Sequence, residues 1–552
     1  MEKSFEKINN PSDESLDKKV INRLEKEVLP RFDFIKKLKE KHKEAEIYLV
    51  GGATRDILMG REIEDYDFLV RKVEKMDLES FLENLGEVNF VGRTFGIFKF
   101  FPKGHDLKEP VDIALPRQDF SLLTGSRHDF KIRTDPELPI EKDLERRDFT
   151  INAIALRIDE GEKKYHLIDV SGGRKDLENG LIKAVGNPRE RFKEDYSRIL
   201  RALRFACQFN FKIEKKTWEE MTRQIKNLNK IRREVILKRE RKFFLPEMVE
   251  YRVVPHEVIA KELIKSFYYR PSQAFEFYDQ AGVFKELMPE VLKMKNCPQP
   301  REYHSEGDVW THTRLALKNL SSKEFFDEFS TYGGSAAGGK EQFGEEKPSS
   351  ELIFGVLFHD LGKPYVIKTP KKDKTERIRF DGHDEEGARI TREICERLKL
   401  SSPERIGIDP KRVSWLVRTH MIFINPEIEK IRARTIEKYF FHPYFNGQDL
   451  LKLGFVDILS SISLGGKPNF DNFHKMLKRI EEIKNLSASR REAPNPLLSG
   501  LEVMEKLSLD PGPEIGKILE VLREEQLSGR VRTREEAMNF LENLKVDPIE
   551  KI

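Results

Sequence analysis

Residues 47–70 hold the side chains of this chain that are best suited to chemistry on a phosphate ester. A short apolar run ends at Gly51 and Gly52, and a second apolar run carries Asp65 and Asp67. Because side chains two positions apart on a strand point to the same face, both carboxylates can reach one site. Carboxylate oxygens suit Mg²⁺, which keeps coordination positions open for phosphates. Paired glycines let the backbone approach a triphosphate closely, so this stretch predicts a site for Mg²⁺ and a nucleoside triphosphate.

Each of these features alone has a structural explanation. An Asp-x-Asp pair is common on half-exposed strands, and a Gly-Gly pair usually marks a turn. Their order here, which is strand, Gly-Gly, helix and strand, favours a catalytic site instead.

A third pair of residues, Asp195 and Arg198, could distinguish nucleobases. Arginine only donates hydrogen bonds and an ionised aspartate only accepts them, which matches the acceptor and donor edge that cytosine and adenine share. Guanine and uracil present the opposite pattern. At i, i+3 spacing on a helix the two side chains would share a face. The pair therefore predicts selection of C and A without a template, and its structural alternative is a surface salt bridge.

These motifs, together with Arg146-Arg147-Asp148, resemble those of the class II tRNA nucleotidyltransferase and poly(A) polymerase family. The resemblance runs from about Ile47 to the C-terminus and is weakest between Lys226 and Lys261. It implies that Asp65 and Asp67 bind Mg²⁺ and that Asp112, on a neighbouring strand, is a third catalytic acid. It also implies that the nucleotide is bound by Gly51, Gly52, Arg55, Asp56, Arg147, Asp148, Asn152, Asp195 and Arg198.

Residues 117–130 correspond to the flexible loop of that family. Asp119 stands where an Arg-x-Glu pattern is more usual. The loop has its full length, which favours addition of A, alone or after C. Residues 255–263 loosely resemble the Glu-Arg-Ile-x-x-Glu-Leu segment of the family but lack its arginine.

A second set of ligand-type residues follows the order His…His-Asp…Asp and resembles the HD metal-dependent phosphohydrolase superfamily. The set is His312, His359, Asp360 and Asp457, with His383 and His420 as candidates for a second metal. Mixed imidazole and carboxylate ligands suit Mn²⁺, Ni²⁺, Fe²⁺ or Mg²⁺ better than a closed zinc site. The alternative is an HD module that keeps the fold without the activity, in which His359 is an ordinary buried histidine.

With 552 residues, of which 36% are charged and 38% hydrophobic, the chain should form three to four domains. The net charge of +4 neither demands nor excludes nucleic acid. We expect an α+β multidomain protein with a polymerase-β-like nucleotidyltransferase head of mixed sheet and helices, followed by all-helical domains. The expected segments are a charged lead-in (1–30), the head (31–157), a neck (158–225), an RNA-binding body (226–300), an HD domain (301–480) and a tail (481–552).

Two segments have special compositions. Residues 330–350 are rich in Gly and Ser, which predicts a mobile loop. Residues 226–242 form the densest basic run, which is either a solvated helix face or a contact for the RNA backbone.

Three scattered cysteines without paired spacing fit a reducing cytoplasm. The start of the sequence lacks the apolar region of a signal peptide, and no apolar run could span a bilayer. We therefore expect a cytoplasmic protein that does not bind membranes.

The family resemblance implies an enzyme that rebuilds the 3′-terminal CCA of tRNA from CTP and ATP by two-metal phosphoryl transfer. An A-adding tRNA nucleotidyltransferase and a poly(A) polymerase share its motifs and remain open. From a different class, the HD domain could be the main enzyme, a phosphohydrolase acting on RNA ends or nucleotides. The expected partners are tRNA, ATP and CTP, and the oligomeric state stays open.

Overall fold

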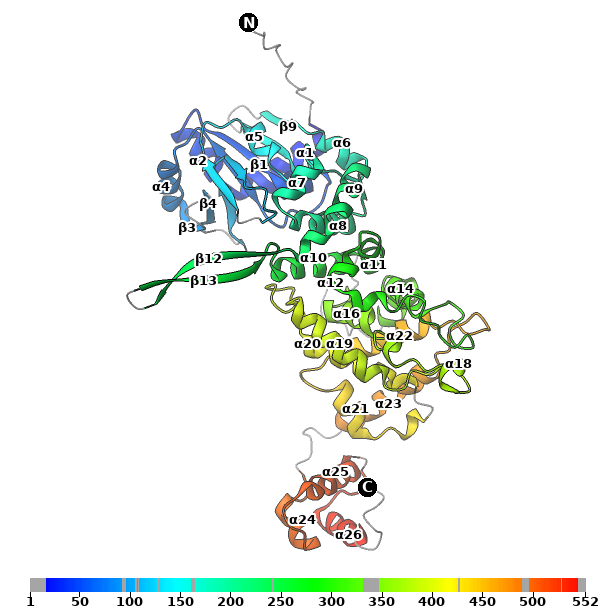
Figure 1. Ribbon diagram of the computed structural model, residues 1–552. Coiled ribbons are helices and arrows are strands. Elements are labelled where there is room, and N and C mark those ends of the chain that lie inside the picture. The colour runs from blue at the N-terminus through cyan, green and yellow to red at the C-terminus, as the bar shows by residue number, and fades with distance from the viewer. Residues whose placement is uncertain are drawn as a thin grey trace. The chain divides into compact units, whose positions relative to one another are not determined.

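The computed structural model (Figure 1) describes residues 16–91, 96–104, 107, 109–126, 129–159, 164–240, 243–330, 347–424, 427–488, 496–527 and 529–544. The chain divides into two compact units. The first is Met1–Met288 with Ser402–Arg405, and the second is Pro289–Ser401 with Ile406–Ile552. The Gly- and Ser-rich loop predicted to be mobile falls mainly on residues 331–346, which lie outside the described residues.

The head of the first unit is a mixed sheet. Within the described residues its seven strands run in the order β3-β4-β5-β2-β1-β8-β9. They are β1 Glu46–Val50, β2 Asp67–Arg71, β3 Gly86–Val91, β4 Ile97–Pro102, β5 Val111–Ala114, β8 Ile154–Asp159 and β9 Lys164–Asp169. β2 and β5 are parallel, whereas β1 pairs antiparallel with both β2 and β8. The mixed sheet and the α+β class are as predicted.

The head includes more of the chain than we expected. Val20, Leu24 and Val28 recur every four residues in the charged lead-in, and all three are buried in the same core as the strands. At the other end, β9 pairs with β8 along its length, so the sheet continues beyond residue 157. Both segments are rich in charged residues, so their apolar residues were not recognised as parts of the core. A helix can be buried along a single apolar stripe, and an edge strand needs only one apolar face.

Helices of the first unit cover the head and form the neck and body. They are α1 Lys18–Arg23, α2 Phe34–Lys41, α3 Gly51–Leu58, α4 Lys75–Leu85, α5 Ile140–Glu145, α6 Gly173–Glu178, α7 Pro188–Glu194, α8 Ser197–Phe209, α9 Lys215–Gln224, α10 His256–Tyr269, α11 Pro271–Gln280 and α12 Val283–Leu287. The short strands β10 Leu181–Ile182 and β11 Lys212–Ile213 pair in parallel.

A buried ion pair joins the neck to the body. Arg204 of α8 donates from Nε to Glu262 of α10 over 2.6 Å, and both side chains are buried. Burial alone would raise the pKa of Glu262, but Arg204 and Arg201 hold it below its usual value. Glu262 belongs to the segment 255–263 that only loosely matched the family pattern, and its contact gives that segment a structural role.

The body is not all helical, which corrects the expectation for residues 226–300. β12 Ile231–Glu240 and β13 Phe243–Arg252 form a long antiparallel hairpin (Figure 1). Val235 and Met248 are directly opposite each other and are 62% and 64% exposed, so this pair gains little from burial. The continuous backbone ladder joins the two strands, and cross-strand pairs such as Arg233–Glu250, at 2.5 Å, lie on its exposed surface. The basic run therefore lies on a hairpin rather than on a helix face.

The second unit is helical. Its helices are α13 Pro289–Leu292, α14 Val309–Asn319, α15 Lys323–Ser330, α16 Ser350–Phe358, α17 Lys363–Val366, α18 Pro370–Asp373, α19 His383–Arg397, α20 Pro410–Thr419, α21 Ala433–Phe440, α22 Gly447–Ser460, α23 Asp471–Ala488, α24 Gly500–Leu507, α25 Pro513–Leu527 and α26 Arg534–Leu544. Residues 352–358 of α16 are all buried, as in a helix surrounded by others. The last three helices have a small core of their own.

Among the helices in the described ranges, none combines the length and the apolar character that crossing a membrane requires.

Candidate active site and candidate metal centre

Three carboxylates lie close together where the interior strands β2 and β5 of the head sheet begin. Asp67 begins β2, and Asp112 of β5 is its direct partner in the parallel register. Asp65 lies two residues before Asp67 and is exposed, whereas Asp67 is half-buried. Burial raises the pKa of Asp67 to about 6; Arg147 opposes this shift, and the charges of Asp112 and Asp65 add to it. Divalent cations would relieve this crowding of negative charge.

Gly51 lies directly against this acidic cluster. Its φ of +67° is one that residues with a side chain rarely adopt. A β-carbon at this position would lie 2.9 Å from Nη1 of Arg147 and 3.1 Å from Oδ2 of Asp67. Gly51 also opens α3, whose preceding residue Val50 supplies no side-chain cap. The first amides of α3 are therefore free of a capping side chain and suited to phosphate oxygens.

A cleft of about 630 Å³ collects the residues predicted for the head and neck. Its lining includes Gly51, Gly52, Arg55, Asp56, Asp65, Asp67, Asp112, Arg147, Asp148, Asn152, Asp195 and Arg198. Residues that are up to 147 positions apart in sequence thus border one space.

Arg55 is held in place from several sides. Its Nε and Nη2 donate to Asp56 over 2.9 and 2.8 Å, and its Nη1 donates to Asn152 Oδ1 over 2.7 Å. The guanidinium also lies 4.6 Å from the ring centre of Phe209. Asp56 and Asn152 thus fix the orientation of the Arg55 guanidinium in the cleft.

Arg201 is a member of the site that sequence reasoning missed. It donates from Nε and Nη2 to Oδ2 of Asp148 over 2.8 and 2.5 Å. Burial alone would raise the pKa of Asp148, but Arg201 and Arg198 keep it far below its usual range. A sequence signal existed, because Arg198, Arg201 and Arg204 recur every third residue along α8 and so share one face.

The Asp195–Arg198 pair differs from its predicted geometry. Asp195 is not on a helix: it lies between α7 and α8 with φ of −152°, and its Oδ1 accepts from the amide of Ser197. Arg198 pairs with Glu194 over 2.6 Å. The chain bends at Asp195 because its short carboxylate bonds the backbone two residues on, as in an Asx turn. Both side chains nevertheless line the cleft.

The predicted flexible loop is built on a hairpin, β6 Arg117–Ser121 with β7 Phe130–Thr134. Asp119, the residue that departs from the family pattern, pairs with Arg117 at 3.2 Å and with Arg146 at 3.1 Å. These contacts fix the base of the hairpin beside the cleft. Residues 127 and 128 of the predicted loop lie outside the described residues.

The second unit brings together every residue of the predicted HD set. Nε2 of His312 lies 3.0 Å from Asp457, and Nε2 of His359 lies 3.4 Å from Asp360. On the other side of Asp360, Nε2 of His383 and Nε2 of His420 lie 3.7 and 3.9 Å from its Oδ1. Asp360 thus stands between two groups that could each hold a cation.

Backbone carbonyls aim three of these histidines inward. Nδ1 of His359, His383 and His420 each lies 2.6–2.8 Å from the carbonyl oxygen three residues earlier. A ring whose Nδ1 donates in this way presents the lone pair of Nε2 to the centre. Gly362 permits the arrangement, because a β-carbon there would lie 2.0 Å from the carbonyl oxygen of His383. Nε2 of His359 is buried without a hydrogen-bond partner, which fits a metal site.

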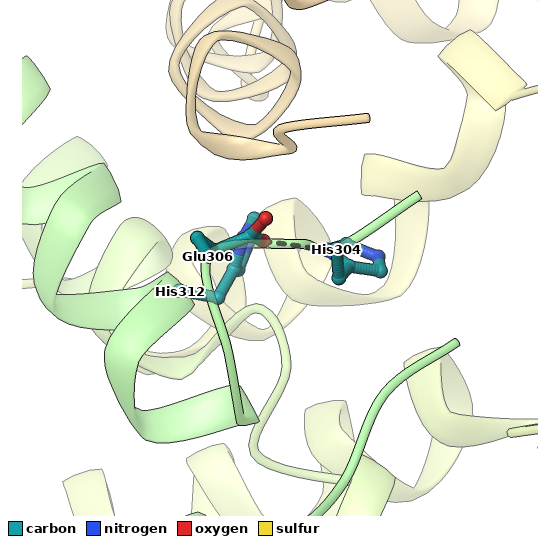
Figure 2. A group of neighbouring side chains, drawn as sticks. All are labelled: His304, Glu306 and His312. Carbon is teal, nitrogen blue, oxygen red and sulfur yellow. Dashed lines mark hydrogen bonds and ion pairs between the residues drawn. The ribbon is translucent and has the colours of Figure 1, made fainter. Parts of the chain in front are cut away.

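Glu306 is a further residue that the sequence did not reveal (Figure 2). Its Oε1 lies 2.9 Å from Nδ1 of His312 and 2.7 Å from Nδ1 of His304. Burial alone would lower the pKa of His312, but its bonds to Asp457 and Glu306 raise it to about 9. Because Glu306 occupies Nδ1 of His312, it orients this ring toward Asp457.

The cavity beside this cluster measures about 1050 Å³ and is lined by acidic, basic and aromatic residues. Lys363, Arg377, Arg379 and Lys475 supply cations, and Tyr303 and Phe380 supply rings. Lys363 was also missed: its ammonium lies 2.7 Å from Oδ2 of Asp360 and is buried. Carboxylates and imidazoles at the base with cations around them suit a phosphate ester.

Comparisons with known proteins find relatives of both halves of the chain. Residues 47–183 match the Poly A polymerase head domain family, and residues 333–452 match the HD domain family. The "A-adding tRNA nucleotidyltransferase" of Deinococcus radiodurans is 30% identical over 502 residues, which are 90% of this chain and 94% of that protein. The "Multifunctional CCA protein" of Nitrosococcus oceani is 30% identical over 358 residues, or 64% of this chain and 70% of that protein.

The crystal structure of the Bacillus stearothermophilus CCA-adding enzyme in complex with CTP has the same fold, with a TM-score of 0.56. The two are 17% identical, and the match covers 94% of this chain and 98% of that one. The match to the Deinococcus radiodurans tRNA nucleotidyltransferase extends over nearly the full length of both chains, and this match decides the family. This chain belongs to the tRNA nucleotidyltransferase and poly(A) polymerase family and carries an HD domain in its second half.

Proposed function

We propose that this chain rebuilds the 3′-terminal CCA of tRNA, using CTP and ATP and releasing pyrophosphate. One observation carries the proposal: the acidic cluster of Asp65, Asp67 and Asp112 shares a single cleft with Asp195 and Arg198. The first group suits phosphoryl transfer and the second suits the edge common to C and A. The relatives named as CCA and A-adding enzymes support this reaction class.

In this mechanism the RNA 3′-hydroxyl attacks the α-phosphate of the nucleotide, and the bond to pyrophosphate breaks. Asp65 and Asp67 would hold Mg²⁺, which when bound activates the hydroxyl and offsets the charge of the triphosphate. Gly51 leaves room for the phosphates beside Asp67, and Arg147 lies at the same point to receive their charge. Asp112 adds a third carboxylate. Its Oδ1 forms an ion pair with Nζ of Lys99 at 3.0 Å.

Base selection would fall to the bend between α7 and α8. Glu194 holds the Arg198 guanidinium, so its remaining donors keep a fixed direction in the cleft. Asp148, fixed by Arg201, would accept from the sugar. A cytoplasmic setting is part of the proposal and agrees with three buried, unpaired cysteines.

A second activity is favoured by the geometry around Asp360. Two groups of candidate ligands share this carboxylate, and the lining of the adjoining cavity includes the cations of Lys363, Arg377, Arg379 and Lys475. We propose that the HD domain binds a divalent metal, Mn²⁺, Ni²⁺, Fe²⁺ or Mg²⁺, and hydrolyses phosphate esters at RNA ends or on nucleotides.

The main proposal is tested with tRNA transcripts that end before CCA, after C and after CC, each incubated with Mg²⁺ and either CTP or ATP. We expect two C additions followed by one A, each on its own primer. Addition of A alone, on the CC end only, would make the protein an A-adding enzyme. Long A tails on unrelated RNA would make it a poly(A) polymerase, and no addition at all would contradict the proposal.

Replacing Asp67 should stabilise the metal-free protein while abolishing nucleotide addition. The pKa of Asp67 in the folded chain, about 6, is above its usual value of about 3.9. Above pH 6 the folded protein therefore carries an unfavourable charge, and below about pH 4 both states are protonated and the cost disappears. Asp67→Asn should raise the free energy of unfolding by about 1–3 kcal/mol at pH 8 in EDTA, and by much less near pH 4.5.

Urea unfolding at the two pH values measures this effect. Asp77→Asn is the matched control, because Asp77 is an exposed carboxylate on α4 of the same head. Equal stabilisation at both pH values, or none at pH 8, would show that ionised Asp67 does not destabilise the folded protein.

The metal centre is tested in the Asp67→Asn background, so that the head site contributes little. Asp360→Asn should lower bound Mn²⁺ by about one or two equivalents per chain and remove hydrolysis of 2′,3′-cyclic phosphate ends. His474→Ala, at an exposed histidine of α23, is the control and should retain the metal. Metal content by mass spectrometry decides, and unchanged Mn²⁺ in Asp360→Asn would exclude Asp360 as a ligand.

A further inference from the structure

Helix α10 of the body contributes two side chains to the cleft of the head. Lys265 and Tyr269 both line this cleft, and both are half-buried. They are four positions apart on one helix, so their side chains share a face. We call this pair the α10 wall of the cleft. The mechanism proposed for nucleotide addition uses neither residue.

Lys265 brings a positive charge to the cleft without a counter-ion. Its ammonium has no hydrogen-bond or ion-pair partner among the residues that the structure describes. Burial lowers the pKa of Lys265, and the charges of Arg204 and Lys261 lower it further; the carboxylates of Glu262 and Asp65 oppose this shift without cancelling it. A half-buried ammonium near other cations is unfavourable until an anion enters the cleft. The α10 wall is therefore suited to a phosphate.

The positive charges of the cleft act on different members of the acidic cluster. Among the cations around Asp67, Arg147 acts most strongly on its pKa, and Arg147 also lies beside Gly51, where the triphosphate would bind. Lys265 instead interacts with the charge of Asp65. In an in-line displacement, the attacking hydroxyl and the leaving pyrophosphate lie on opposite sides of the α-phosphate. With the triphosphate beside Arg147, the α10 wall is left for the attacking RNA strand.

Tyr269 adds an aromatic ring one turn further along α10. Burial raises the pKa of its hydroxyl, and the carboxylate of Glu64 adds to this shift. Glu64 directly precedes Asp65, so the ring lies near the segment that carries this carboxylate. Four residues of helix, about 6 Å of rise, separate the cation from the ring. One nucleotide can thus contact Lys265 with its phosphate and Tyr269 with its base.

We propose that Lys265 and Tyr269 form the subsite for the last nucleotide of the RNA primer. Lys265 pairs with the phosphate on the 5′ side of this nucleotide, and Tyr269 stacks on its base. Together they direct the 3′-hydroxyl toward Asp65. Because stacking accepts every base, the subsite serves primers that end before CCA, after C and after CC. The inference rests on the proposed CCA addition.

Kinetics with CTP and a tRNA transcript that ends before CCA test the role of Lys265. Lys265→Gln should raise KM for tRNA about tenfold and leave kcat and KM for CTP unchanged, because the contact is made in the ground state and in the transition state alike. Lys261→Gln is the matched control. It removes the same charge one turn earlier on α10, at an exposed residue that does not line the cleft, and should keep the original constants.

Two results would overturn the role of Lys265. A rise in KM for CTP rather than for tRNA would place Lys265 at the triphosphate. An equal rise in KM for tRNA in Lys261→Gln would show that the net charge of α10 matters and that the subsite does not.

A primer with one neutral phosphate tests the contact itself. A methylphosphonate before the last nucleotide should raise KM for tRNA of the original protein about tenfold, and Lys265→Gln should raise it no further with this primer. If the effects of the methylphosphonate and of Lys265→Gln multiply, Lys265 does not contact this phosphate.

The ring of Tyr269 is tested by two substitutions. Tyr269→Ala should raise KM for tRNA about tenfold, whereas Tyr269→Phe should keep the original value, since stacking requires the ring and not the hydroxyl. Equal losses in the two variants would exclude stacking.

Failure of the subsite and failure of the proposed function give different results. If the original protein and Lys261→Gln add no nucleotide to any primer, the proposed function fails and the subsite fails with it. If both add nucleotides while Lys265→Gln and Tyr269→Ala keep the original constants, only the subsite fails.

Discussion

The site depends on one constraint: three carboxylates must be held close together although they repel one another. The parallel register of β2 and β5 sets Asp67 opposite Asp112, and the turn before β2 adds Asp65. Burial and the neighbouring charges raise the pKa of Asp67 to about 6, so the metal-free head stores unfavourable electrostatic energy. The fully buried strand β1, which pairs with β2 in the middle of the sheet, provides the rigid support that this arrangement requires.

Arginines supply the opposing charge and connect the sheet to the helices. Arg147 lies against Gly51 and Asp67, whereas Arg201 holds Asp148 from α8. Arg204, one turn further along α8, is in turn held by Glu262 of α10. Asp148, Arg201, Glu262 and Arg204 thus form one series of charged pairs that joins the head to the neck and body. Because these pairs are largely buried, loss of one partner would leave an uncompensated charge and affect the others.

The sequence was most informative where chemistry demands particular residues at short spacing. Gly51, Asp65, Asp67 and the HD ligands could be named because metal and phosphate sites restrict residue type. Glu306 could not, since a side chain that orients another leaves no local pattern. Arg201 was missed although Arg198, Arg201 and Arg204 recur every third residue. The β12–β13 hairpin was mistaken for a helical body because its strands are highly charged. Asp195 was expected on a helix, but its bond to the Ser197 amide bends the chain there.

A crystal structure with Mn²⁺ and a CTP analogue that cannot be cleaved at the α-phosphate tests the central claim most directly. Anomalous scattering should locate Mn²⁺ between Asp65 and Asp67, with the phosphates beside Gly51 and the cytosine edge on Asp195 and Arg198. Phosphates bound elsewhere in the cleft, or a head that binds the analogue without Mn²⁺ at the two aspartates, would contradict the account.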